Sequence, residues 1–435
     1  MTAEIAIMNK EAIALAADSA VTMSQESGQK VFTSANKLFT LSKFYPVGMM
    51  VYGSASFMGV PWETIIKIYR NKLGKRKFGT LNKYADDFIA FLDNGNPLFP
   101  EDQQKKYLYG STFSYFTLIR EEIEKKVKSI VEKEGKIEID QIEEITSDAI
   151  KEHYDKLQKT KMLQSIPTNY IENIINKYGD IIDKAKEKIF EKLPVSTGSL
   201  NKLRKIAASL FSKDIFQSNI SGVVIAGFGE KDTFPSLKSF DIEGIVNNKL
   251  KYRRRESLSV EIGFENNATI IPFAQREMVA AFMTGIDPYL QDQIEGYLSE
   301  IFDKYPEIIV ENIEKFDYNE KKMLKEKLKK LSNNIFKKYQ EDIETYRTKS
   351  YVDPVIRVVA MLPKDELAVM AETLVSLTSF KRKVTMDETV GGPIDVAVIS
   401  KGDGLVWIKR KHYFRSELNP QFFANYYREV KDGKK

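Results

Sequence analysis

Two short apolar segments near the N-terminus constrain the fold of this chain most strongly. Residues 4–8 and 12–17 are each long enough for one strand, and the Asn-Lys-Glu sequence at 9–11 between them is typical of a tight hairpin turn. The second segment shows little alternation of apolar and polar residues, which predicts a strand buried on both faces. The chain therefore begins with a hairpin whose second strand belongs in the interior.

Two charged residues are tied to these apolar segments. Asp18 directly follows the second segment, where an unpaired carboxylate would be costly. Lys37 lies at the start of another apolar run, on a predicted third strand, so its ammonium would also be partly removed from water. Each residue alone has an ordinary explanation: a turn cap for the aspartate and an edge lysine that reaches solvent. Together they predict a buried ion pair.

Thr2 adds a third polar residue, directly after the initiator Met1. Removal of Met1 by methionine aminopeptidase would leave a threonine that carries both a hydroxyl and a free α-amine. Such an amine has a reference pKa of about 7.7–8.0, so near neutral pH it can accept the proton of the hydroxyl and make it a nucleophile. A threonine in second place is common by itself. The hypothesis depends on the order and spacing of Thr2, Asp18 and Lys37.

The segment 15–22, Leu-Ala-Ala-Asp-Ser-Ala-Val-Thr, resembles a motif of proteasome β subunits and of the related bacterial proteasome-like peptidases. It matches without a gap from Thr2, and Lys37 falls close to the family lysine after a few extra residues. The strand predicted at 47–55 is similar to the family strand whose last glycine, here Gly53, donates an N–H to the oxyanion. The resemblance implies an α+β fold: the four-layer αββα sandwich of N-terminal-nucleophile hydrolases.

The resemblance also implies roles for individual residues. The catalytic set would be Thr2, Asp18, Lys37, Gly53 and Asp387. The residues that bind the substrate as an added strand would be Ala20, Val21, Thr22 and Val51.

The chain departs from the family pattern at two places. Val390 stands where the family has an auxiliary serine, in a segment that otherwise matches the family's Asp-x-x-Ser-Gly-Gly. A second family turn, similar to Gly-Ser-Gly, is replaced by residues 273–277, where Gln275 is the available polar substitute.

At 435 residues the chain is about twice as long as single-domain members of this family, and the excess is helical in pattern. We predict six segments. The sandwich would comprise 1–96, 216–286 and 353–411; helical insertions would occupy 97–215 and 287–352; and 412–435 would form a tail.

Composition excludes several classes of function. There is no cysteine, which rules out disulfides and thiolate chemistry, and the two histidines lie far apart in dissimilar contexts, so we expect no metal and no cofactor. The net charge of +5 is small for this length, which makes nucleic-acid binding unlikely. No apolar run has membrane-spanning length and the start lacks the form of a secretory signal, so we expect a cytoplasmic protein that binds no membrane.

These observations favour a threonine peptidase that cleaves peptide or protein substrates, assembles as a homo-oligomer and works with an ATP-dependent unfoldase or activator. Two alternatives remain open at this stage. The departures at the auxiliary serines fit a non-catalytic ring or scaffold subunit, and the same chemistry would also suit an acylase acting on small amides.

Overall fold

The computed structural model describes residues 3–25, 28–93, 95–217, 220–385 and 391–424. The fold is α+β with antiparallel sheets, as the sequence predicts at this coarse level. The chain divides into two compact units: Met1–Leu38 together with Glu261–Lys435, and Phe39–Val260. We call them the terminal unit and the central unit.

The terminal unit contains a five-stranded antiparallel sheet in which β2 is the middle strand. The β1–β2 turn is closed by Asn9, whose Oδ1 accepts hydrogen bonds from the backbone N–H of Glu11 (2.9 Å) and of Ala12 (3.1 Å). Every residue of β2 is buried, which confirms the prediction from its pattern. The strand order is β13 (Ala268–Ala274), β1 (Glu4–Asn9), β2 (Ala12–Ala17), β14 (Asp395–Ser400), β15 (Gly404–Lys409).

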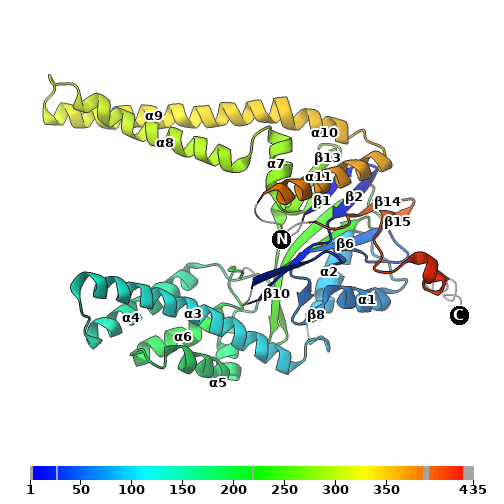
Figure 1. The fold of residues 1–435 in the computed structure, drawn as a ribbon, viewed down its shortest axis with the longest axis horizontal. Coiled ribbons are helices and arrows are strands. Elements are labelled where there is room, and N and C mark those ends of the chain that lie inside the picture. The colour runs from blue at the N-terminus through cyan, green and yellow to red at the C-terminus, as the bar shows by residue number, and fades with distance from the viewer. Residues whose placement is uncertain (1–2, 26–27, 94, 218–219, 386–390, 425–435) are drawn as a thin grey trace. The chain divides into compact units, whose positions relative to one another are not determined.

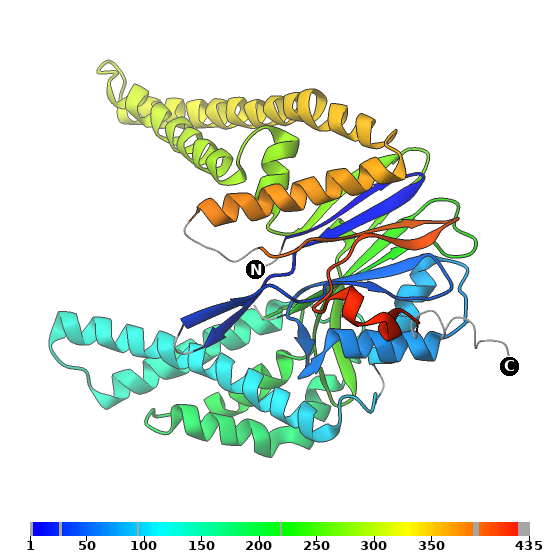
Figure 2. The ribbon, with the colours of Figure 1, turned by 45° about the vertical axis from the view of Figure 1, so that its right-hand side comes forward.

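Helix α11 (Lys364–Val384) lies across one face of this sheet, over β1, β2 and β14 (Figure 2). Strand alternation turns Ile5, Ile7 and the even-numbered alanines of β2 toward the leucines of α11 in one apolar cluster. The same alternation gives the opposite face the apolar residues Ala6, Met8, Ile13 and Leu15. The terminal unit also contains α7 (Arg276–Thr284), α10 (Asp353–Val359) and the two-stranded pair β3 (Val21–Gln25) and β4 (Gly28–Phe32).

A long helical hairpin extends from the terminal unit. It consists of α8 (Pro288–Glu311) and α9 (Tyr318–Arg347), which run side by side in Figure 1. The N-cap of α8, Asp287, accepts a hydrogen bond from the N–H of Tyr289 and pairs with Lys381 of α11 at 3.1 Å. The base of the hairpin is thus fastened to the helix that covers the sheet.

The central unit has its own antiparallel sheet. Two amphipathic helices, α1 (Trp62–Leu73) and α2 (Leu81–Leu92), contribute an aromatic core together with its strands. The strand order is β11 (Lys249–Arg254), β10 (Ser236–Val246), β9 (Ser221–Gly227), β6 (Val47–Gly53), β5 (Leu38–Thr40), with β12 (Val260–Glu261) beside β10 and a separate pair β7 (Ser56–Phe57) and β8 (Val60–Pro61).

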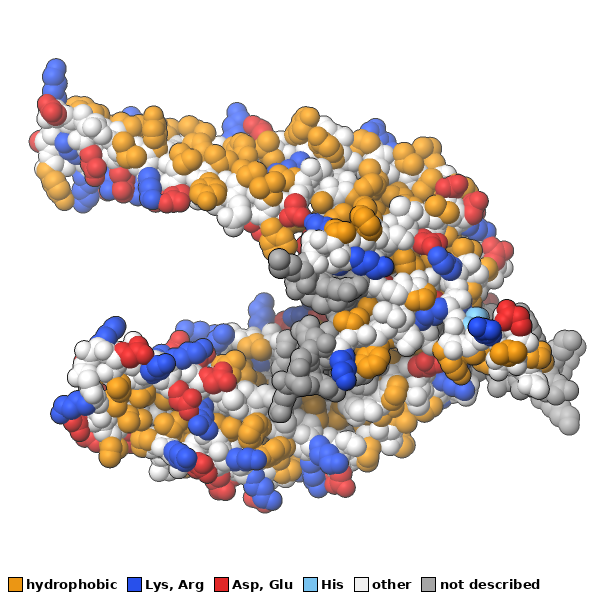
Figure 3. Space-filling model, in the orientation of Figure 1, with side chains coloured by type: hydrophobic (Ala, Val, Ile, Leu, Met, Phe, Trp, Pro, Cys, Tyr) orange, Lys and Arg blue, Asp and Glu red, His pale blue; other side chains and the backbone are white. Residues whose placement is uncertain are grey.

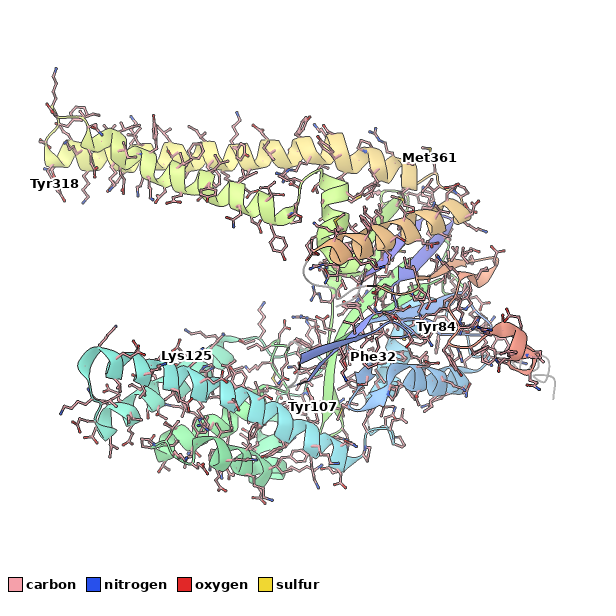
Figure 4. The ribbon with its side chains drawn as sticks, viewed as in Figure 1. Phe32, Tyr84, Tyr107, Lys125, Tyr318 and Met361 are labelled. Carbon is pink, nitrogen blue, oxygen red and sulfur yellow. The ribbon has the colours of Figure 1, made fainter. Side chains whose placement is uncertain are left out.

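Four further helices of the central unit form a second apolar cluster: α3 (Glu101–Glu134), α4 (Ile139–Lys159), α5 (Tyr170–Phe190) and α6 (Thr197–Ser209). Buried polar contacts tie them to the sheet. The hydroxyl of Tyr170 donates to the carbonyl of Val246 (2.7 Å), and Lys251 donates to the carbonyl of Leu210 (2.6 Å) while pairing with Glu243 (2.6 Å). Tyr107, labelled in Figure 4, points from α3 at Glu243 of β10.

Residues 236–246 form the single strand β10, whose pairing with β11 has a register shift between Ile242 and Gly244. Lys37 was expected on a third strand, but it immediately precedes β5. The predicted helical stretches within 97–215 and 287–352 are present as α3–α6 and α8–α9. Within the described residues, no helix combines the length and apolarity needed to cross a membrane.

Candidate active site

Asp18 is the centre of the candidate site. It follows β2 directly and is fully buried. Its Oδ1 accepts the Ala3 N–H (3.0 Å) and the Lys37 ammonium (2.6 Å), and its Oδ2 accepts the N–H groups of Gly391 (3.0 Å) and Ala20 (3.3 Å). Four donors satisfy both oxygens, which is what a buried carboxylate requires. The carboxylate therefore joins the start of the chain, the loop after β2, Lys37 and the segment before β14.

Lys37 forms the predicted ion pair with Asp18. The lysine is only 5% exposed, so both partners are removed from water. The loop that leads to it is fastened by a backbone hydrogen bond from Ala35 N–H to the Ser19 carbonyl (3.1 Å). Breaking a buried pair of this kind by removing one partner costs about 3–5 kcal/mol, because the remaining charge is left without a counter-charge. The geometry holds the ammonium in one place.

Glu4 belongs to the same cluster and was not among the predicted site residues. It is 2% exposed on β1, and in the part of the chain that the structure describes neither carboxyl oxygen has a hydrogen-bond partner. Burial raises the pKa of Glu4 well above its ordinary value; the positive charge of Lys37 opposes this shift and the negative charge of Asp18 adds to it. The signal in the sequence was a single acid in an otherwise apolar strand.

Four more of the predicted site residues lie in segments that the structure describes. Ala20 is buried and precedes β3, Val21 is half-buried at the start of β3, and Thr22 follows it in the strand. Val51 is buried in β6 of the central unit. Thr2 and Asp387, together with Val390, lie outside the described residues.

Gly53 ends β6 in the central unit with a φ of +79°, a conformation that side chains rarely adopt. A Cβ built at this position would meet the Ile220 carbonyl oxygen at 2.3 Å. The position therefore requires glycine for two independent reasons. The role of its N–H as an oxyanion donor stays a prediction.

Gln275 has the left-handed conformation (φ 53°, ψ 55°) at the N-cap of α7. Such a conformation is uncommon for a residue other than glycine, and outliers of this kind concentrate at functional positions. Gln275 lies at the end of β13, next in the sheet to β1. The structure thus provides a specific backbone feature at the position where the sequence suggested a substitute polar group.

The chemistry available at this cluster is that of a buried, fixed ammonium next to the start of the chain. Ala3, the residue after Thr2, is hydrogen-bonded to the same carboxylate that holds Lys37. Among the described residues there is no group of three or more histidine, aspartate or glutamate side chains that could hold a metal ion.

Comparison with models of known protein families finds no match, and comparison with curated proteins finds no match above the significance threshold.

Proposed function

We propose that the chain is a threonine peptidase of the N-terminal-nucleophile class, with Thr2 as nucleophile after removal of Met1. The observation that carries the proposal is the anchoring of Ala3 and Lys37 on one buried carboxylate. This contact fixes the residue after Thr2 and the ammonium with respect to each other. A scaffold subunit has no evident need for a buried ion pair at the start of its chain.

In the proposed mechanism, the Thr2 hydroxyl attacks the carbonyl carbon of a peptide bond, and its proton passes to the Thr2 α-amine. The α-amine then gives the proton to the departing amine of the substrate. An ester between Thr2 and the substrate remains. Water attacks this ester with the α-amine again accepting its proton, and the threonine hydroxyl is restored.

The charges near Lys37 would suit this role of the α-amine. A neighbouring positive charge disfavours the protonated form of an amine and so lowers its pKa. Asp18 holds Lys37 in place, and burial raises the pKa of Glu4, which favours the neutral form of this neighbouring carboxyl.

For the fold we propose the αββα sandwich of N-terminal-nucleophile hydrolases. The support comes from each unit separately. In the terminal unit an antiparallel sheet has helices on one face and apolar side chains on the other, and the central unit has an antiparallel sheet with two helices in its aromatic core. A sheet with two apolar faces needs cover on both.

The decisive experiment uses an electrophilic peptide that becomes covalently attached only by reacting with both the hydroxyl and the α-amine of one residue. We expect the wild type and Thr2→Ser to be labelled and to hydrolyse peptide amides, and Thr2→Ala to do neither while keeping its circular dichroism spectrum. Intact mass should show that Met1 is absent. Retention of Met1, or undiminished turnover by Thr2→Ala, would refute the proposal.

A further inference from the structure

The hairpin α8–α9 has almost no core of its own. In this fully described stretch α8 has two buried residues, Pro306 and Val310, among 24, and α9 has none among 30. The two helices contact each other through Phe302 and Phe336, whose ring centroids are 5.6 Å apart, and through polar pairs such as Lys325 and Lys329 with Glu307. Helices of this length are normally stabilised by packing of an apolar face.

An apolar face is present but lies in solvent. On α8 six large apolar side chains recur at intervals of three and four residues, and all are exposed, Ile301 by 56% and Tyr297 by 67%. This spacing is that of a helix-packing seam. The six are Leu290, Ile294, Tyr297, Ile301, Tyr305 and Ile308. Figure 3 shows hydrophobic side chains along the hairpin, and Tyr318 at its tip, labelled in Figure 4, is also exposed.

Helix α9 continues this face. Ile335, which is exposed, directly precedes Phe336, and Ile301 on α8 directly precedes Phe302. Each isoleucine is therefore rotated by about 100° around its helix axis from the phenylalanine that contacts the other helix. Because the two helices run antiparallel, a step of one residue toward the N-terminus on each of them leads to the same side of the pair. Leu331, one turn before Ile335, extends the stripe. The hairpin therefore has one broad apolar face made by both helices.

We propose that this face pairs with the same face of a second copy of the chain to form a four-helix bundle. The size is adequate: α8 is about 36 Å long at 1.5 Å per residue, and two helices side by side are about 20 Å wide. The face would then bury about 700 Å² per copy, close to the roughly 800 Å² per partner of stable interfaces. Any other binding partner would have to present an apolar surface as long as this face.

The opposite charges of α8 and α9 favour a second copy of the chain as the partner and determine how the two copies are oriented. Helix α8 carries six acidic residues and one lysine, whereas α9 carries eight lysines and one arginine against five acidic residues. A two-fold axis parallel to the helices places each acidic α8 over the basic α9 of the other copy, with neighbouring helices antiparallel. An axis perpendicular to them would place like charges together. In the favoured arrangement, Ile301 faces Ile335 of the partner subunit.

Sedimentation of the full chain tests the pairing. We expect the double variant Tyr297→Glu, Ile301→Glu to have half the mass of the wild type at the same concentration, because two carboxylates would be buried in the apolar face. The control Ser299→Glu also places a glutamate on α8, at an exposed residue outside the stripe, and should keep the wild-type mass. The wild type, the double variant and the control should have the same circular dichroism spectrum, since the changed residues are exposed.

The arrangement has its own test, helped by the absence of cysteine from the chain. Equal amounts of Ile301→Cys and Ile335→Cys, mixed and oxidised, should give disulfide-linked dimers containing one chain of each, whereas Ser299→Cys mixed with Ile335→Cys should not. A wild type that is monomeric, a mass unchanged in the double glutamate variant, or equal cross-linking in the two mixtures would overturn the proposal. None of these outcomes depends on catalytic activity.

Discussion

At the scale of single residues, the buried carboxyl of Glu4 makes the stability of the protein depend on pH. Burial raises the pKa of Glu4 in the folded chain above its value in the unfolded chain. Between these two pKa values the folded state holds one proton more than the unfolded state, so the free energy of unfolding falls as pH rises, by about 1.4 kcal/mol per pH unit. Below the pKa of the unfolded chain both states hold the proton, so Glu4 no longer lowers the free energy of unfolding through its ionisation.

We therefore expect Glu4→Gln to be more stable than the wild type at pH 7–8, with the difference shrinking toward pH 4.5. Glutamine keeps the shape of the neutral acid and cannot ionise. Urea unfolding of both proteins across this pH range measures the difference directly. Glu11→Gln, at an exposed residue of the β1–β2 turn, serves as a control and should show no comparable trend. A Glu4→Gln difference that does not vary with pH would contradict the assignment.

The two members of the central ion pair should respond unequally to substitution. Asp18→Asn leaves the buried Lys37 ammonium without its anionic partner, and we expect a loss of about 3–5 kcal/mol in the free energy of unfolding. Lys37→Met leaves the Asp18 carboxylate three backbone N–H donors, from Ala3, Ala20 and Gly391, and should cost less. Denaturant unfolding of both variants provides the comparison. Equal losses would show that the backbone donors contribute little.

At the scale of secondary structure elements, the end of β6 can be tested against a matched glycine. Gly53 and Gly59 have similar positive φ values, +79° and +83°, but only Gly53 has an atom, the Ile220 carbonyl oxygen, in the way of a Cβ. Gly59→Ala should lose about 1 kcal/mol from backbone conformation alone. Gly53→Ala should lose clearly more, because β6 must also move from residue 220. Thermal unfolding separates the two, and similar shifts would mean that the strand end yields easily.

Several elements were predictable from the sequence because a local pattern determines them. The pattern of Ala12–Ala17 predicted a buried strand, and Asp18 and Lys37 predicted each other because a buried charge needs a partner. Glu4 escaped prediction because one acid in a strand usually faces water, and its burial depends on distant segments. The shift within β10 was also invisible, since it depends on pairing with β11.

At the scale of the whole molecule, the two tryptophans can report how the two units unfold. The chain has only two tryptophans, Trp62 in the core of the central unit and Trp407 on β15 of the terminal unit. Each single-tryptophan variant therefore reports on one unit. If unfolding of the two units is coupled, the chain should unfold in one transition.

We expect the Trp407 fluorescence of Trp62→Phe to follow the same urea transition as its far-UV circular dichroism, although the substitution weakens the other unit. That substitution removes the hydrogen bond from the indole N–H to the Ser221 hydroxyl (2.8 Å), which contributes about 1 kcal/mol. In one coupled transition this loss lowers the midpoint seen by both probes. In Trp407→Phe the Trp62 signal should likewise coincide with the dichroism. Separate fluorescence and dichroism midpoints in either variant would mean that the two units unfold independently.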